Sequence, residues 1–430
     1  MNIKRRFHVQ FTEKNLTGNA GLVHLGQFAQ KLGLHKLLEQ NISIVRGPNA
    51  KLSVADGIVI LAMGVLAGAK HMSHLAILRA DAVLCALFKW DDFPDDTTFG
   101  RLFKLFRPKH CQELSEIETI ARNKVWSKRW FGRVTLELDS AVKGVFGSQQ
   151  GAEKGFNPKK KGQKSYHPLF CFIAETRECL HNWFRTGSAY TGNGAVEFMK
   201  ECFCKLPKRV WKVFVRADSG FFNGGLLDFL EEKASQYLIK VKMRNLTDLL
   251  MQQTWRKAKN KPGIETTEFT HQCHGWKKPR KFVAVRRLID PGTKGTLFPI
   301  PQYEFLCYVT NLCLTPWEIH KCYAKRSTSE NWIEWCKNQM ASGNILTQEF
   351  WANSAIFQTC ILAYNLLVWM MWLNYEKGFS QEPDTIRAWL IHVPARLLHG
   401  SRQWILKLSE TYLFKEQWQQ IENSIGALTV

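Results

Sequence analysis

The feature that most constrains the fold is a change of pattern at Phe131, after which strand-like segments begin and then alternate with helical ones. Three runs rich in β-branched and aromatic residues, separated by Gly, Pro and Asn, predict adjacent antiparallel strands. A helical pattern, a buried strand, a second helical pattern and another strand follow. The predicted strands cover residues 133–146, 167–175, 179–186, 211–217 and 237–241, and the two helices cover residues 195–206 and 226–233.

This order is that of an RNase H-like α/β domain, although several α/β folds share stretches of it. After residue 244 a basic segment with short strands interrupts the pattern, which resumes with a strand at 305–311 and a long helix at 316–340. Thr315 is the predicted N-cap of that helix, and Pro316 lies in its first turn. Asp96 or Thr97 is the predicted N-cap of one N-terminal helix.

The predicted α/β core is therefore divided by an insertion and flanked by helical regions. The N-terminal helices are expected to recognise DNA ends, or to serve in packing or dimerisation. The predicted domains are a helical DNA-binding or assembly domain (1–125), the first part of the RNase H-like core (126–244), an inserted basic β subdomain (245–304), the second part of the core (305–345) and a helical C-terminal region (346–430).

The charge balance narrows the class of function. The 430 residues include 59 Lys and Arg against 37 Asp and Glu, a net charge of +22. Such an excess favours a polyanionic partner, nucleic acid first and an acidic membrane surface second. A chain that is 45% hydrophobic and 22% charged is neither disordered nor collagen-like, and it is not a small disulfide-stabilised protein.

Targeting and redox features favour a cytosolic protein. The basic N-terminus has no apolar stretch after it, so no secretory signal peptide is expected. Twelve cysteines without a CxxC pair are typical of reduced thiols rather than of a zinc module. Residues 355–373 carry no charge and are long enough to span a bilayer. Their Gln358, Thr359 and Asn365 favour a buried core helix, and a basic membrane-associated protein is the alternative.

Two acidic residues stand where strands normally carry apolar side chains. Asp139 lies within the first predicted strand, and Asp218 follows the fourth. Taken singly, each is also typical of an ordinary turn. The first and fourth strands are neighbours at the centre of an RNase H-like sheet, so the two carboxylates would repel each other unless a cation lay between them. Mg²⁺ needs only one or two protein carboxylates when phosphate and water complete its coordination.

The long predicted helix carries a third candidate acid. Tyr323, Arg326, Glu330 and Lys337 fall within roughly 60° of one another at about 100° per residue, so they form one stripe. Such a stripe is also typical of a solvated face with an i, i+4 ion pair. An acid aligned with Tyr, Arg and Lys fits a helix that lies against a sugar-phosphate backbone, with the acid reaching a metal and the cations reaching phosphates.

Further cations lie near the two aspartates in the sequence. The run at 157–164 between the first two strands is predicted to contact DNA phosphates, or to form a solvated loop. Arg216 precedes Asp218 by two residues and is expected either to contact DNA or to point to the opposite face. Residues 254–296 add a net charge of +8 with interleaved aromatic residues. The lysines of the run are Lys159, Lys160, Lys161 and Lys164.

These motifs resemble those of DDE-type transposases of bacterial insertion sequences. Tyr323, Arg326, Glu330 and Lys337 match, at every spacing, the Y-(2)-R-(3)-E-(6)-K signature of the large cut-and-paste superfamily. Within it the chain looks most like the group of insertion sequence thirteen-eighty. The resemblance runs from about residue 10 to 408, through the motifs LDSAVKGVFGSQQGAEKGFNPKKKGQKSYHPL, NGAVEFMKE, VRADSGFF, LAYNLL and PARLLHGSRQW. Ala141 departs from the family, where Thr often follows Asp-Ser.

The resemblance implies that Asp139, Asp218 and Glu330 are the catalytic triad and bind two divalent ions, Mg²⁺ or Mn²⁺. It implies that Tyr323, Arg326 and Lys337 contact phosphates at the transposon ends. A relative uses an aromatic side chain of the insertion to accommodate a flipped base; Trp276 is the candidate here, and an ordinary packing role is the alternative.

The expected reaction follows from two metal ions roughly 3.5 to 4 Å apart, which activate the nucleophile and stabilise the leaving oxygen. Water would free the 3′ end at the terminal inverted repeats, and that hydroxyl would then attack target DNA. The expected partner is double-stranded DNA, bound by a homodimer, and no membrane partner is expected. The expected location is the bacterial cytoplasm, at the nucleoid. The alternative is a catalytically silent, transposase-derived DNA-binding protein.

Overall fold

The core of the protein is one mixed sheet of nine strands, seen in a computed structural model that describes residues 8–155, 157, 160–259, 261–290, 302–375, 381–400 and 402–429. The strand order is β7-β6-β2-β8-β9-β13-β12-β11-β10. In chain order, the first five strands of this sheet are β2 (Arg133–Ser140), β6 (Leu169–Ile173), β7 (Cys179–Trp183), β8 (Lys212–Ala217) and β9 (Gln236–Lys240). They confirm all five strands predicted between residues 133 and 241, as parts of a mixed α/β fold.

Strand β2 is the third strand from the β7 edge of the sheet. It pairs antiparallel with β6, where Asp139 faces Phe170, and parallel with β8, where Leu138 faces Ala217. Strand β9 continues the parallel pairing next to β8. The carboxyl ends of β2 and β8 therefore meet at the same end of the sheet, with α8 (Ala195–Cys204) and α9 (Gly224–Glu232) linking the strands as predicted.

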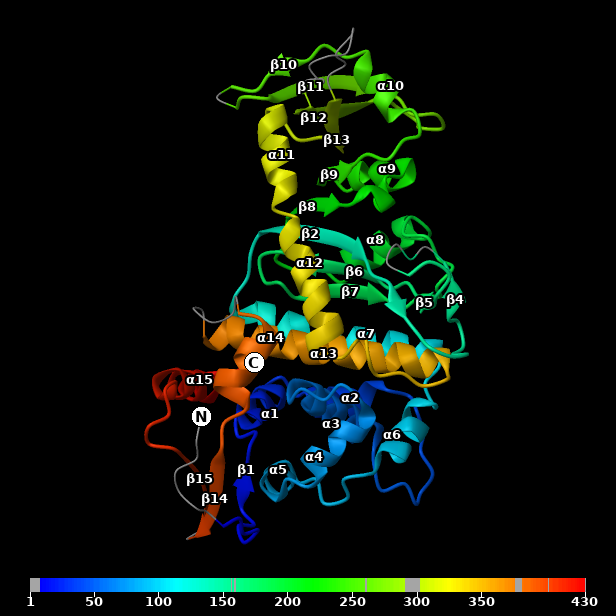
Figure 1. Ribbon diagram of the computed structural model, residues 1–430. Coiled ribbons are helices and arrows are strands. Elements are labelled where there is room, and N and C mark those ends of the chain that lie inside the picture. The colour runs from blue at the N-terminus through cyan, green and yellow to red at the C-terminus, as the bar shows by residue number, and fades with distance from the viewer. Residues whose placement is uncertain are drawn as a thin grey trace.

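The predicted insertion adds strands to this same sheet. Strand β13 (Gln302–Thr310) confirms the strand predicted at 305–311, and it pairs with β9 on one side and with β12 (Arg280–Asp290) of the insertion on the other. Strands β11 (Ile264–His271) and β10 (Arg256–Lys257) follow, after α10 (Leu246–Met251). The hydrogen bonding is continuous from the core to the insertion, and the added strands lie in the upper half of Figure 1. The domain boundaries stay predictions.

Two long helices pack beneath the sheet and separate it from the N-terminal helices. In Figure 1, α7 (Pro108–Lys128) and α13 (Phe350–Asn374) lie side by side there, and α3 (Val54–Leu66) packs on α13. Helix α13 is the one described helix long and apolar enough to cross a membrane, but 89% of its most apolar window is buried inside the protein. Burial against the sheet and against α3 accounts for its apolar sequence.

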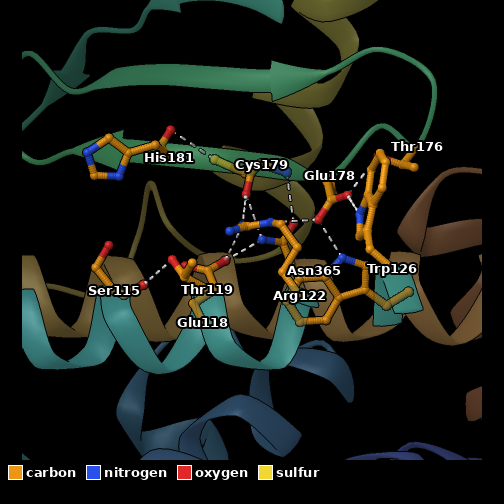
Figure 2. Close-up of polar contacts among 11 residues, drawn as sticks. Ser115, Glu118, Thr119, Arg122, Trp126, Thr176, Glu178, Cys179, His181 and Asn365 are labelled. Carbon is orange, nitrogen blue, oxygen red and sulfur yellow. Dashed lines mark hydrogen bonds and ion pairs between the residues drawn. The ribbon is translucent and has the colours of Figure 1, made fainter. Parts of the chain in front are cut away.

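A buried polar network fixes the edge strand β7 to these two helices (Figure 2). The carboxylate of Glu178 accepts hydrogen bonds from Arg122 Nε at 2.9 Å, Trp126 Nε1 at 2.6 Å and Trp369 Nε1 at 2.6 Å. Asn365 of α13 accepts an N–H from the backbone of β7 and donates to its carbonyl. Polar groups buried this deeply need partners, so the network ties α7 and α13 to one position on the sheet.

The long helix predicted for residues 316–340 is divided in two. Helix α11 (Pro316–Ala324) ends before Arg326, and α12 (Ser327–Glu334) continues into a π-helical turn at Trp335–Gln339. The N–H of Arg326 donates to Tyr323 and that of Ser329 donates to Arg326, so the backbone spacing tightens from four residues to three at the break. Thr315 caps α11 as predicted.

Two further predictions were wrong. The C-terminal region predicted to be helical over residues 346–430 contains a hairpin: β14 (Ala395–Gly400) and β15 (Gln403–Leu408) pair with each other, and β14 pairs with β1 (Leu16–Thr17). The period-two alternation of β14, with Ala395 and Leu397 buried and Arg396 exposed, is that of a strand. Asp95, rather than Asp96 or Thr97, is the N-cap of α6, because its carboxylate accepts the N–H of Thr98.

The remaining elements are short and mostly surround the N-terminal domain and the loop between β2 and β6. The helices are α1 (Leu22–Lys31), α2 (Leu34–Asn41), α4 (Ala76–Arg79), α5 (Ala82–Phe88), α6 (Asp96–Phe103), α14 (Pro383–Ile386) and α15 (Lys415–Ala427), and the strands are β3 (Lys143–Gly144), β4 (Glu153–Lys154) and β5 (Lys164–Tyr166).

Candidate active site

A cavity of about 1180 Å³ opens at the carboxyl ends of β2 and β8. Its lining comes from the ends of these two strands, the loop between β2 and β6, the loop after β7, the segment after β9, and helix α12 with its π-helical turn. All three predicted acids, Asp139, Asp218 and Glu330, line this one cavity. Its polar and charged lining also includes Lys160, Gln163, His167, Tyr190, Thr191, Lys242, Glu334, Lys337 and Asn338.

The two aspartates are brought together by the parallel register. Because Leu138 of β2 faces Ala217 of β8, Asp139 and Asp218 follow at the same end of adjacent strands. Asp218 ends its strand and caps the short helix after it by accepting the N–H of Gly220 at 2.9 Å. Asp139 is the second-to-last residue of β2, and its carboxylate accepts the N–H of Ser140 at 2.8 Å. Each carboxylate is thus held by the local backbone.

Burial and a neighbouring carboxylate raise the pKa of Asp139, while an arginine opposes them. Its side chain is only 13% exposed, and burial raises the pKa to about 6. The negative charge of Asp218 adds to that rise. Arg326 lowers the pKa, since its Nη2 lies 2.7 Å from Asp139 Oδ2. The same Arg326 nitrogen also donates to the carbonyl of Leu138 at 3.1 Å.

The stripe predicted on the helix is only partly realised as one face. Glu330 is exposed to solvent and lines the cavity. Lys337 also lines the cavity, and its Nζ donates to the carbonyl of Val142 at 3.0 Å. Arg326 instead points into the protein towards Asp139. Tyr323 does not line the cavity; it is half-buried beside Tyr308, and burial raises its pKa to about 12. Tyr323 still lies near enough to Arg326, Asp218 and Asp139 for their charges to act on its pKa.

The predicted lysines of the loop differ in position. Lys160 lines the cavity and lies over the ring of Phe146. Lys161 and Lys164 are exposed but do not line it. Lys159 lies outside the described residues. The prediction of a basic loop close to Asp139 is therefore met by one described lysine, Lys160.

Two residues predicted to contact DNA, Arg216 and Trp276, contact other side chains of the protein. Arg216 is buried, its guanidinium binds Glu137 with Nε at 2.7 Å from Oε1, and it donates to the carbonyl of Cys322. Glu137 and Asp139 are two residues apart in β2 and share one face of the sheet, so Arg216 lies on the face that carries Asp139, although it does not line the cavity. Trp276 does not line the cavity either: it packs 5.2 Å from the ring of Phe222, and Arg280 lies 4.9 Å from its centroid. These contacts fit the packing alternative, and the predicted DNA contact of Trp276 stays a prediction.

The sequence as a whole matches a family model described as the transposase DDE domain, group 1, over residues 2–430. The chain belongs to this family of DDE transposases. None of the curated proteins matches it. Among solved structures it is similar to a piggyBac transposase in a synaptic complex with hairpin DNA, at 12% identity and a TM-score of 0.44, covering 88% of this chain and 81% of that one.

DDE transposases generally use divalent metal ions. Within the ranges that the structure describes, no three His, Cys, Asp or Glu side chains gather closely enough to hold an ion by themselves. The donor chemistry still fits a hard cation, because Asp139 and Asp218 supply two carboxylates from adjacent strand ends and Mg²⁺ completes its shell with phosphate and water. Glu330 lines the same cavity without forming a three-residue cluster with them.

Several residues of the transposase cavity were not predicted from the sequence. His167 Nδ1 donates a hydrogen bond to the carbonyl of Ala189 at 2.5 Å, and burial lowers the pKa of His167. Thr191 lies 2.9 Å from the hydroxyl of Ser140, and Lys242 follows β9. His167 and Ser140 stood inside a quoted family motif, but Thr191 and Lys242 reach the site only through the fold.

Proposed function

We propose that this protein is a DNA transposase that cuts at terminal inverted repeats and transfers the freed strand into target DNA, by a cut-and-paste route that depends on divalent metal. The observation that carries the proposal is the convergence of Asp139, Asp218 and Glu330 on one cavity. The proposal includes an RNase H-like core with an inserted subdomain and membership of the insertion sequence thirteen-eighty group. It also includes a homodimer on DNA in the bacterial cytoplasm.

The aspartates are the proposed metal ligands. Asp139 and Asp218 would hold the ions, with Glu330 as the third acid. The bound metal supplies Lewis-acid activation of a hydroxyl and stabilisation of the leaving oxygen. Asp139 must be ionised for this role, and Arg326 favours its ionised form. Arg326 therefore acts on the carboxylate rather than on DNA in this arrangement.

The cationic lining is the proposed phosphate-binding surface. Lys160, Lys242 and Lys337 line the cavity from three different segments, and charge-assisted contacts to phosphate fix the register of DNA without reading its sequence. Backbone contacts of this kind make affinity fall steeply with salt.

The test uses a pair of acids on successive turns of α12. Glu330 and Glu334 both line the cavity, but only Glu330 belongs to the signature. Purified Glu330→Gln and Asp139→Ala proteins are expected to lose Mg²⁺-dependent nicking of a terminal-repeat duplex by at least 10³-fold while retaining DNA binding. Glu334→Gln is the matched control and should retain nicking within about fivefold. Cleavage by Asp139→Ala would refute the assignment.

A second candidate is a catalytically silent DNA-binding protein. The observation that favours it is the pairing of Asp139 with Arg326, together with the lack of a three-ligand cluster among the described residues. An end-joining assay with the purified wild-type chain separates the two candidates. Metal-dependent joining of a cleaved end to plasmid DNA would exclude the silent protein.

A further inference from the structure

A second basic surface lies at the opposite end of β2 and β8 from the cavity. It is formed by two linkers, residues 129–132 between α7 and β2 and residues 205–211 between α8 and β8. Figure 1 shows the first linker entering β2 at the end away from its arrowhead. The surface, called the tryptophan platform below, consists of the exposed side chains Lys128, Trp130, Lys208, Arg209, Trp211 and Lys212.

Trp211 is supported on one side only. The backbone N–H of Trp211 donates to the carbonyl of Gly132 at 2.9 Å. The indole of Trp211 lies so close to Gly132 that a Cβ added to this glycine would come within 1.8 Å of the ring. The absence of a side chain at Gly132 therefore lets the indole rest on the backbone. Yet Trp211 is 67% exposed. A large apolar ring held in place with most of its surface in water is suited to stacking rather than to core packing.

A second aromatic ring and an arginine extend this surface. Trp130 is 43% exposed, and its ring centroid lies 6.0 Å from that of Trp211 with an interplanar angle of 63°. The guanidinium of Arg209 lies 5.4 Å from the centroid of Trp130. The cation is thereby positioned beside the rings. Arg209 also lines an adjoining cavity of about 440 Å³ with Lys124 and Lys208.

The charge of the platform has one sign. Residues 123–133 and 205–212 contain eight Lys or Arg and no Asp or Glu. Across the ranges described by the structure, none of Lys128, Lys208, Arg209 and Lys212 takes part in a salt bridge. Repulsion among these cations is relieved by a polyanion, and exposed aromatic rings among cations are typical of surfaces that bind nucleic-acid strands.

We propose that the tryptophan platform is a second nucleic-acid site, at which Lys208, Arg209 and Lys212 contact backbone phosphates and a base stacks on Trp211. This inference rests on the proposed function only in taking DNA as the polyanion. The eight residues of β2 separate the platform from the cavity by roughly 26 Å at 3.3 Å per residue. One strand would therefore leave the cavity before reaching the platform, or a separate DNA segment would bind there.

The experiment measures binding of the full chain to a labelled 20-nucleotide single strand and to a duplex without terminal repeats, by fluorescence anisotropy across a salt series. Trp211→Ala is expected to weaken single-strand binding at least tenfold. The double variant Lys208→Glu with Arg209→Glu is expected to weaken binding to both DNAs at least 30-fold and to reduce the salt slope. Trp404→Ala, which removes another exposed tryptophan, is the matched control and should change binding less than twofold.

The two DNAs identify the source of the contact. A Trp211→Ala loss confined to the single strand assigns a stacked base, and an equal loss for both assigns a groove or backbone contact; either result supports the platform. Binding that stays within twofold for both platform variants overturns it, as does a change of oligomeric state in sedimentation without a change in DNA affinity. Thermal unfolding by circular dichroism verifies that each variant is folded.

The proposal for the tryptophan platform and the proposal for the active site can be refuted independently. Asp139→Ala should keep platform binding, and Trp211→Ala should keep nicking of a terminal-repeat duplex within about threefold. If Asp139→Ala still cleaves, the proposed active site is wrong while the platform result stands. If the platform variants bind normally but Asp139→Ala is inactive, only the second site is wrong.

Discussion

Arg326 Nη2 lies 2.7 Å from Oδ2 of Asp139, at the point where helix α11 gives way to α12. A positive charge of the protein itself thus occupies one side of the carboxylate proposed to bind metal. Since burial and the negative charge of Asp218 raise the pKa of Asp139, the opposing charge of Arg326 favours the ionised carboxylate near neutral pH. Through this ion pair, the position of Arg326 at the junction of α11 and α12 affects the ionisation of Asp139 in the cavity.

Replacing Arg326 should move the pH dependence of cleavage. Arg326 lowers the pKa of Asp139, so Arg326→Gln raises it above about 6 and protonates the carboxylate over a wider range. We expect the acid limb of the cleavage profile to move to higher pH and activity at pH 7 to fall at least tenfold. Lys321→Gln, on the exposed side of α11, is the control. An unchanged acid limb in Arg326→Gln would contradict the pairing.

The Glu178 network should contribute strongly to stability. Glu178→Gln leaves the buried guanidinium of Arg122 without its closest carboxylate, and breaking a buried pair in this way typically costs about 3–5 kcal/mol. Urea denaturation measures the loss. Glu197→Gln, at an exposed position of α8, should change the free energy of unfolding by less than about 0.5 kcal/mol. A similar small change in Glu178→Gln would show that the network is not cooperative.

His24 should make the protein sensitive to acid. Burial lowers its pKa from 6.5 to about 4, so the unfolded chain binds a proton before the folded one does, and stability is lost as pH falls from 6.5 towards 4. His24→Phe keeps an aromatic ring against Trp418, 4.3 Å away, and removes the titration. Denaturation midpoints measured between pH 7 and 4 should fall less steeply in this variant than in the wild type. Parallel curves would assign the acid sensitivity to other groups.

Lys143 should make the stability of the protein rise with pH in the alkaline range. Its ammonium is buried, donates to the carbonyl of Ser342 at 2.7 Å, and has a pKa lowered by burial to about 7. The unfolded chain holds this proton up to about pH 10.5, so the free energy of unfolding rises with pH from about 7 upward. Lys143→Met is expected to flatten that rise between pH 7 and 9.5 in urea titrations. A slope equal to that of the wild type would mean that Lys143 is hydrated.

The sheet and the positions of the two aspartates were readable from the sequence because strand order and period are local signals. Asp139 and Asp218 each interrupt a β-rich run, and the parallel pairing of those runs brings them together. The burial of α13 was also readable, since its polar residues are incompatible with lipid and find partners in the protein. Asn365, for example, hydrogen-bonds to the backbone of β7.

Tertiary contacts decided what the sequence could not. An ideal helix places Tyr323, Arg326 and Glu330 on one stripe, but Arg326 binds a carboxylate on a neighbouring strand and the backbone tightens around it. Arg216 reads as a free cation until its pairing with Glu137 is seen. Charged residues near an active site have several partners at similar sequence distances, and only the packing selects among them.

The continuous pairing of β9, β13 and β12 has a consequence for engineering the chain. Deleting the insertion would remove the neighbour of β13 along eight paired positions and leave the N–H and C=O groups of β13 unpaired. An unpaired edge strand of this kind pairs with strands from other molecules. A shortened variant would therefore be expected to aggregate before its loss of DNA chemistry could be measured, so the basic outer strands are better probed by charge reversal than by truncation.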